Sequence, residues 1–190
     1  VVSVICALIA GTVGLLIGYG VAKKRKSKMA SGVNALAFLP YLLPSITLSA
    51  IFFDMASTFS AAGFKFLYRN PMFLAILLGS IKFIPFASRS ATNAMLQLSN
   101  EIEEAAVIQN VPWWKRMVRV IFPIQKSTFI SGYILPFTSC MRELSLFVLL
   151  AAGQTVLLTT LLDEWMQWWP QSANALNLLI VVTVLIINFL

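Results

Sequence analysis

Five stretches of this chain are each nearly as long and as apolar as a helix that crosses a lipid bilayer. Such a helix needs about 20 mostly apolar residues, and the stretches lie at about 1–22, 33–53, 72–88, 128–152 and 173–190. Lipid offers no hydrogen-bond partner to an exposed backbone, so each span must be helical. The sequence therefore predicts an all-α fold, a polytopic membrane helical bundle in which residues 1–190 form a single transmembrane domain.

Composition argues against several other classes of protein. The chain is 59% hydrophobic and 11% charged, whereas soluble domains are about 45–50% apolar and about 25% charged. It has no histidine, and its two cysteines, Cys6 and Cys140, both lie in apolar runs. We therefore expect no disulfide framework, no catalytic residue, no metal site and no cofactor. In a membrane protein the net charge of +7 reports the orientation of loops rather than a nucleic-acid surface.

Lysine and arginine are distributed unevenly between the predicted loops. The first and third loops hold ten of them, whereas the second holds Lys65 and Arg69. Cytoplasmic loops carry the excess of positive charge, so the first and third loops are predicted to be cytoplasmic. The N-terminus of this segment then lies outside and its C-terminus inside a cell (inner or plasma) membrane. Both ends lie within apolar runs and the first residue is not Met, so we expect a fragment of a longer chain.

Glycines and prolines suggest how the spans pack. Gly14 and Gly18 form a GxxxG pair that shares one face of the first span with Gly11. Small residues of this kind let two helix backbones approach closely. Proline removes a backbone hydrogen bond and kinks a helix, so Pro40 and Pro44 are predicted to interrupt the second span.

The third loop, about 89–125, is too long for a simple connection, and it begins with helix signals. Asn100 followed by Glu103 resembles a capping box, which predicts a helix from Glu101 to about Gln109. Asn110 then suits the left-handed residue that commonly ends a helix.

A second short helix is predicted after this turn. Pro112 suits its first turn, and Pro123 is expected to end it before the fourth span. An alternative is an amphipathic surface helix held on lipid by Trp113 and Trp114. That alternative explains the aromatic and basic residues, but not the glutamates at an anionic surface.

The same loop carries a longer pattern. It reads Glu104-Ala105-Ala106, three residues, Asn110, nine residues, then Val120-Ile121-Phe122-Pro123. This resembles the EAA loop of permease subunits in binding-protein-dependent ABC importers, whose pattern is E-A-A, three residues, Gly, nine residues and I-x-L-P. Asn replaces the glycine, and it is among the non-glycine residues that best accept φ > 0. The turn is therefore expected to survive.

The resemblance implies a five-helix permease core with a cytoplasmic coupling helix. Its ATPase-coupling residues would be Glu104, Ala105, Ala106, Asn110 and Pro123. The implied partners are an ABC ATPase subunit dimer, a periplasmic or extracellular solute-binding protein and a second permease half, fused or separate. The sequence has no P-loop pattern, so ATP hydrolysis is expected on a partner subunit and this chain is not an enzyme.

Three further segments carry the resemblance along the chain. Residues 39–45 (LPYLLPS) resemble the start of the permease core, and residues 82–86 (KFIPF) resemble the family's R-x-x-P-F element. Residues 142–145 (RELS) resemble an element of the branch that imports ferric iron. Ferric iron is therefore the predicted solute, with thiamine, phosphonate and polyamine as alternatives.

Two charges lie deep in the fourth predicted span. Arg142 and Glu143 would be about 22 Å along the helix from its cytoplasmic end, where charges normally face the bundle interior or a wet cavity. Adjacent helical positions point about 100° apart, so we expect one to line the solute pathway and the other to pair across the bundle with Lys82. A purely structural ion pair is the alternative.

Two other classes of membrane protein fit less well. A secondary transporter or channel would carry ion-coupling carboxylates in several spans, and only Glu143 is deep. A membrane enzyme would need catalytic groups clustered at one membrane face, and the acids of this sequence are scattered.

Overall fold

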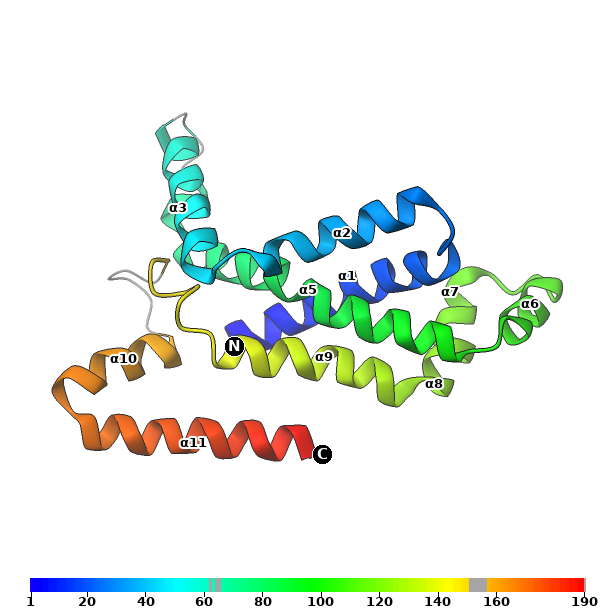
Figure 1. Ribbon diagram of the computed structural model, residues 1–190. Helices are drawn as coiled ribbons and strands as arrows, with labels where there is room; N and C mark the ends of the chain where they lie inside the picture. Colours follow the sequence, from blue (N-terminus) through cyan, green and yellow to red (C-terminus); the bar gives the residue numbers. More distant parts are fainter. Residues whose placement is uncertain (62, 64–65, 151–156, 190) are drawn as a thin grey trace.

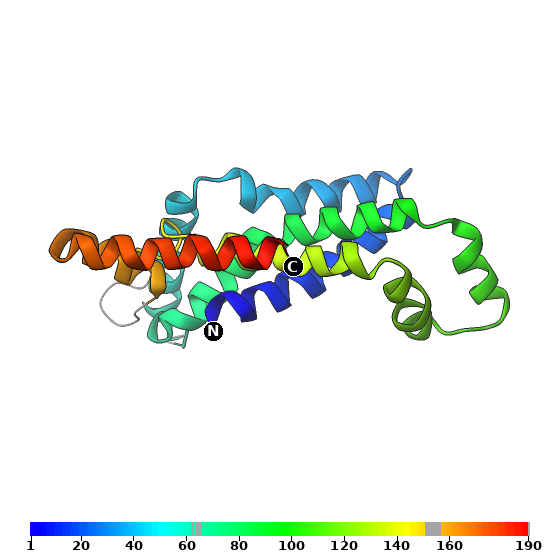
Figure 2. The same ribbon diagram turned by 90° about the horizontal axis from the view of Figure 1, so that it is seen from below.

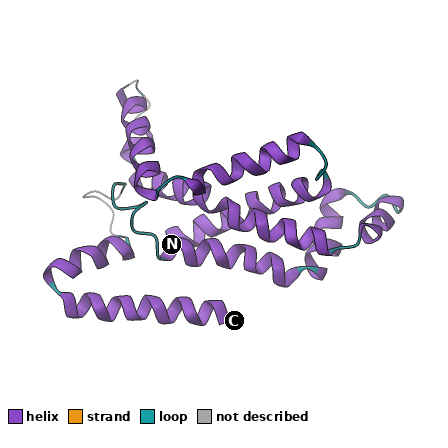
Figure 3. Cartoon of the chain, viewed as in Figure 1, coloured by secondary structure: helices purple, strands orange, loops and turns teal. Residues whose placement is uncertain are grey.

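The structure is a computed structural model that describes residues 1–61, 63, 66–150 and 157–189, and every regular element in these ranges is helical (Figure 3). The all-α prediction is confirmed. The elements are α1 (Val2–Lys23), α2 (Lys28–Leu42), α3 (Ser45–Ala61), α4 (Phe66–Arg69), α5 (Pro71–Gln97), α6 (Asn100–Ile108), α7 (Trp113–Arg116), the π-helical turn η1 (Met117–Ile121), α8 (Phe122–Ile124), α9 (Lys126–Met141), α10 (Leu158–Trp168) and α11 (Pro170–Phe189).

Helices α1, α5 and α9 pack against one another at the centre of an elongated bundle (Figure 1). Helix α2 covers α1 and α5, and α11 runs back along α9, as the view from below also shows (Figure 2). The short helices α6 to α8 lie at one end, beside the turn between α1 and α2, and α10 lies towards the other end. The two predicted basic loops therefore meet at the same end of the bundle. Lys65, counted in the second loop, lies outside the described residues.

Three of the described helices, α1, α5 and α11, are long and apolar enough to cross a membrane. Helices α2 and α3 qualify only as a pair, and they are bent by 98° at the break between them. Leu43, which precedes Pro44, is extended (φ −78°, ψ 139°), as proline requires of the residue before it. Pro44 therefore interrupts the second predicted span, as expected, and divides it into the two helices α2 and α3. Pro40 is accommodated within α2.

The fourth predicted span, 128–152, is wrong in its second half. Helix α9 ends at Met141, and residues 142–150 form a series of turns; residues 151 and 152 lie outside the described ranges. Glu143 Oε1 accepts the backbone N–H of Leu146 at 3.3 Å, and such local side-chain bonds compete with helix continuation. Arg142 and Glu143 are therefore not neighbours on one helix, and the 100° argument does not apply to them.

Helix α5 is longer than predicted, extending past residue 88 to Gln97. Its last turns remain helical because Ala91, Ala94 and Met95 keep facing a buried cluster that also contains Ile121 and Phe129. The exposed Arg89 does not end the helix. Its guanidinium lies 5.1 Å from the centre of the Phe38 ring in α2, a cation–π contact.

Close packing of α1 on α5 follows from the small residues predicted for that purpose. A Cβ added to Gly14 would lie 2.5 Å from Cβ of Ala87, and one added to Gly18 would lie 2.5 Å from the carbonyl oxygen of Ser88. Gly11 faces the ring of Tyr133 in α9. The three glycines therefore face α5 and α9, and the predicted packing face is confirmed.

Gly18→Ala should destabilise the fold by about 1–3 kcal/mol, as overpacking of a tight contact does. Gly20→Ala is the matched control, because nothing lies within 4 Å of a Cβ at that position of the same helix. It should leave stability unchanged or slightly raised. The measurement is the denaturation midpoint of the detergent-purified protein. Equal midpoints for the two variants would contradict the close contact.

Candidate functional site

Helix α6 begins the loop between α5 and α9, and Ser99 caps it. The Ser99 hydroxyl accepts the backbone N–H of Glu101 at 3.3 Å. The prediction of a capping box with Asn100 as the cap is wrong by one residue, because serine is an equally good cap and stands one position earlier. Glu101 and Glu103 lie in the first turn, where the helix dipole favours carboxylates.

The end of α6 is a Schellman motif centred on Asn110. Asn110 N–H donates to the carbonyl of Val107 at 2.9 Å, and Val111 N–H donates to the carbonyl of Ala106 at 3.0 Å, which is the bonding pattern of this motif. Asn110 has φ +55°. The predicted left-handed turn is confirmed, and it directs the chain sharply away from the axis of α6.

The second part of the loop is helical in three short pieces. Pro112 is the residue before α7 rather than part of its first turn, and Pro123 lies within α8. The prediction that Pro123 ends the helix is therefore wrong, and the break comes at Gln125 (φ −107°, ψ 24°). Proline cannot donate a backbone bond and crowds the carbonyl four residues before it. The chain widens to π-helical bonding at η1, which ends at Ile121, two residues before Pro123.

Glu103 attaches α6 to the end of α1. Only 6% of its surface is exposed. Its Oε1 accepts the Tyr19 hydroxyl at 2.6 Å, and its Oε2 lies 2.6 Å from Lys23 Nζ. Burial alone would raise the pKa of Glu103, but the ion pair with Lys23 and the bond from Tyr19 outweigh it and lower that pKa below its ordinary value. Glu103 is therefore held as a carboxylate at neutral pH.

The second short helix is attached to the same place. The Trp113 ring meets the Tyr19 ring edge to face, with centroids 5.8 Å apart. Met117 and Ile121 are buried against the last turns of α5. Both halves of the loop thus contact the end of α1. The sequence analysis did not predict the contacts of Glu103 with Tyr19 and Lys23. Tyr19 precedes the basic cluster that begins at Lys23, and this order was the sequence feature that could have indicated them.

The opposite side of α6 is exposed. We call Glu104, Ala105 and Ile108 the outer face of α6: all three are exposed, and Ile108 retains 81% of its surface. Ala106 is half-buried, and Asn110 is exposed at the turn. Pro123 lies apart from this face, in α8, where the chain returns to the bundle (Figure 1). The structure thus groups four of the five predicted coupling residues on one short segment.

A second group of charges lines a cavity of about 640 Å³. Its walls are residues 41–45 from the α2–α3 break, Lys82, Phe83 and Phe86 from α5, and Ser139, Arg142 and Glu143 from the end of α9 and the turn after it. Lys82 is 5% exposed, lies 3.8 Å from Glu143 Oε2 through its Nζ, and donates to the Ser45 hydroxyl. The three predicted pathway residues therefore share one cavity. Ser45 was not predicted.

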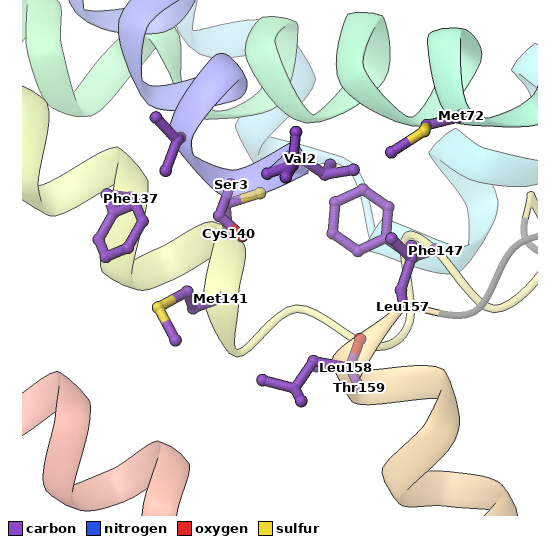
Figure 4. A pocket seen from close by; sticks show the side chains of 12 residues that line it. Val2, Ser3, Met72, Phe137, Cys140, Met141, Phe147, Leu157, Leu158 and Thr159 are labelled. Atoms are coloured by element: carbon purple, nitrogen blue, oxygen red, sulfur yellow. The ribbon is translucent and has the colours of Figure 1, made fainter.

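The other cavity near the end of α9 is different in character. It measures about 420 Å³ and lies between the start of α1, the end of α9 and the start of α10 (Figure 4). Val2, Phe147 and Leu158 line it with hydroxyls from Ser3 and Thr159, and no charged side chain does. Of these two cavities, the one at Lys82 is the better suited to a charged solute.

Comparison with known proteins assigns the family. Residues 14–190 match the family described as binding-protein-dependent transport system inner membrane component. The chain belongs to this family. The family consists of transport permeases rather than enzymes, and this member is a multi-pass membrane protein.

Two similar permeases match this chain over only part of their own length. A probable sulfate transport system permease protein of Chlorokybus atmophyticus is 26% identical over 64% of the chain and 44% of its own length. A probable ABC transporter permease protein of Pyrococcus horikoshii is 28% identical over 84% of the chain and 58% of its own length. The chain thus spans about half the length of these relatives.

A solved structure supports the same fold. The MetNI methionine ABC transporter, in inward-facing conformations, matches with a TM-score of 0.67 at 16% identity, covering 99% of this chain and 88% of the other. At that identity the likeness concerns the fold alone.

Asn110→Gly should leave the permease intact, because glycine adopts φ > 0 freely, whereas Asn110→Val should strain the turn by about 1–3 kcal/mol. The measurement is the denaturation midpoint of each purified variant, together with the rate of proteolysis within the loop. A valine variant as stable and as resistant as the glycine variant would contradict the left-handed turn.

Glu103→Gln should destabilise the purified permease by about 1.5–3 kcal/mol, the range for a hydrogen bond to a charged group. Glu101→Gln, an exposed carboxylate in the same turn of α6, is the control and should change stability by less than about 0.5 kcal/mol. Lys23→Met combined with Glu103→Gln should cost less than the sum of the single changes. If the destabilisation by the double change equalled the sum of the two single changes, the result would argue against the contact between Lys23 and Glu103.

Proposed function

We propose that this chain forms one half of a solute pathway in an ATP-driven importer, and that the outer face of α6 docks on an ATPase subunit. The observation that carries the proposal is the combination of family membership with an exposed α6. A helix that shows Glu104, Ala105 and Ile108 to solvent has an apolar side chain that a partner would cover.

The chemistry of this face suits such a partner. The small side chain of Ala105 lets another surface approach the helix closely. The Glu104 carboxylate can form charge-assisted hydrogen bonds with a basic groove. Ala106 and Asn110 act through the turn, since the Ala106 carbonyl closes the Schellman motif. We assign Pro123 a separate part, as the residue that shapes the return of the chain into α9.

The remaining partners and the orientation follow from the same proposal. The end that carries α6 and the two basic loops is assigned to the cytoplasm, where the ATPase dimer works. A soluble binding protein would deliver solute on the outer side, and a second permease half, fused or separate, would complete the pathway. A secondary transporter is less well supported, because Glu143 is the one carboxylate among the described residues that line the charged cavity, and it is paired with Lys82.

Ferric iron is the solute that residues 142–145 suggest, but two observations count against it. One relative is a sulfate permease. The cavity that holds Arg142 and Glu143 presents two cationic side chains and one carboxylate, whereas hard metal cations prefer several oxygen ligands. Within the described residues no group of three or more Cys, Asp or Glu could hold a metal ion. We therefore assign Lys82, Arg142 and Glu143 to the pathway without assigning them to iron.

Glu104→Lys should reduce ATP-driven uptake at least about tenfold, because a like charge placed against a basic groove costs several kcal/mol. The measurement is solute uptake and solute-stimulated ATP hydrolysis by the complete transporter in proteoliposomes. Glu101→Lys is the matched control, since it makes the same charge change on an exposed residue of α6. Normal stimulated hydrolysis in Glu104→Lys would refute the proposed docking face.

A further inference from the structure

The cavity at the α2–α3 break contains an arrangement of charge that the importer assignment does not explain. Lys82, Arg142 and Glu143 line it together with the hydroxyl-bearing Ser45 and Ser139. Two cations against one carboxylate leave the cavity with a net positive charge. We propose that this cavity is a binding subsite for a small oxyanion of the sulfate or phosphate type, which makes the solute class of the proposed importer an anion.

The position of Lys82 gives the first support. It lies in the middle of α5, about 22 Å from the loop end of that helix at 1.5 Å per residue, and it is 5% exposed. A buried cation at this depth is costly unless it is paired or lines a wet cavity. Its pairing is loose, because Glu143 Oε2 lies 3.8 Å away. An ammonium has three donors, so Lys82 can bind an anion while it still contacts Ser45 and Glu143.

Arg142 supplies the second positive group. In the described part of the chain its only hydrogen bond runs from Nε to the carbonyl of Thr138, at 3.4 Å, and it has no carboxylate within ion-pair distance. A guanidinium carries five N–H donors in a fixed fork that matches oxyanion geometry. The four N–H groups on its two terminal nitrogens therefore remain for a ligand at the cavity wall.

The backbone also contributes positive electrostatic potential to the cavity. The Leu48 N–H bonds to the carbonyl of Pro44, so α3 starts at the cavity wall with its positive end and with the unpaired N–H groups of a first turn. Interrupted helices in transporters use such ends to hold anionic groups. Ser45 stands at this end and also accepts from Lys82. One break in the chain thus brings a helix end and a buried lysine to one cavity.

Glu143 provides a test in which the direction of the change in affinity distinguishes an anionic ligand from a cationic one. Replacing it with glutamine removes the negative charge from the cavity without changing the shape of the side chain. An oxyanion should then bind more tightly, whereas a cationic solute would bind more weakly. A residue that merely packed the fold would change binding of both kinds of ligand in the same direction.

The experiment measures equilibrium binding of ³⁵S-sulfate and ³²P-phosphate to the complete transporter in nanodiscs, without nucleotide and without binding protein. At least one label should bind. Arg142→Gln and Lys82→Gln should each weaken that binding at least tenfold, and Glu143→Gln should strengthen it several-fold. Arg89→Gln, an exposed cation farther along α5, should leave it unchanged. Comparing the two labels identifies which oxyanion is preferred.

Three outcomes would overturn the proposal: no binding of either label, binding that Arg142→Gln does not alter, or weaker binding in Glu143→Gln. Arg142 is exposed, so its variant remains informative even where Lys82→Gln does not fold. The subsite rests on the proposed importer function, but its failure is distinguishable. ATP-driven uptake with no oxyanion binding would remove the subsite alone, whereas oxyanion binding without ATP-driven uptake would remove the importer alone.

Discussion

The close contact between α1 and α5 is the interaction on which the attachment of the α6 loop depends. Gly14 and Gly18 bring the two backbones together where any larger side chain would collide with Ala87 or Ser88. This contact fixes the end of α1 beside the start of the loop. Tyr19 and Lys23 therefore lie beside Glu103 of α6, the helix that follows α5 in the chain. Without that approach, the buried carboxylate of Glu103 would lose both of its partners.

The cost of burying charge determines where α9 ends and where the charged cavity lies. Helix α9 ends at Met141 rather than continuing through Arg142 and Glu143. The turn that follows lets Glu143 reach Lys82 on α5 and bond its own backbone at Leu146. A charge in an apolar region needs a partner, and breaking one helix supplies that partner for less free energy than leaving the ions unpaired. The same break opens the wall of the charged cavity.

Much of the loop could be predicted from the sequence because its signals are local. The left-handed residue at Asn110 follows from the chemistry of one turn, and the glycine face of α1 follows from helical spacing. The sequence could not predict the end of α9, because apolar residues continue to Leu150 and hydropathy favours a longer helix. The sequence also could not predict that Glu103, rather than Glu104, is the buried carboxylate. It depends on where α1 ends in space, which spacing within α6 does not reveal.

These contacts connect the exposed face of α6 with the cavity through a short path. Helix α6 follows α5 after two residues, Leu98 and Ser99, and Glu103 attaches it to α1. The second short helix contacts α1 through Trp113 and Tyr19, and η1 contacts the last turns of α5. The loop is thereby held on both central helices at once. Since α5 carries Lys82 in its middle, a helix that the loop contacts also carries a cation of the charged cavity. The α2–α3 break lies at the wall of the same cavity.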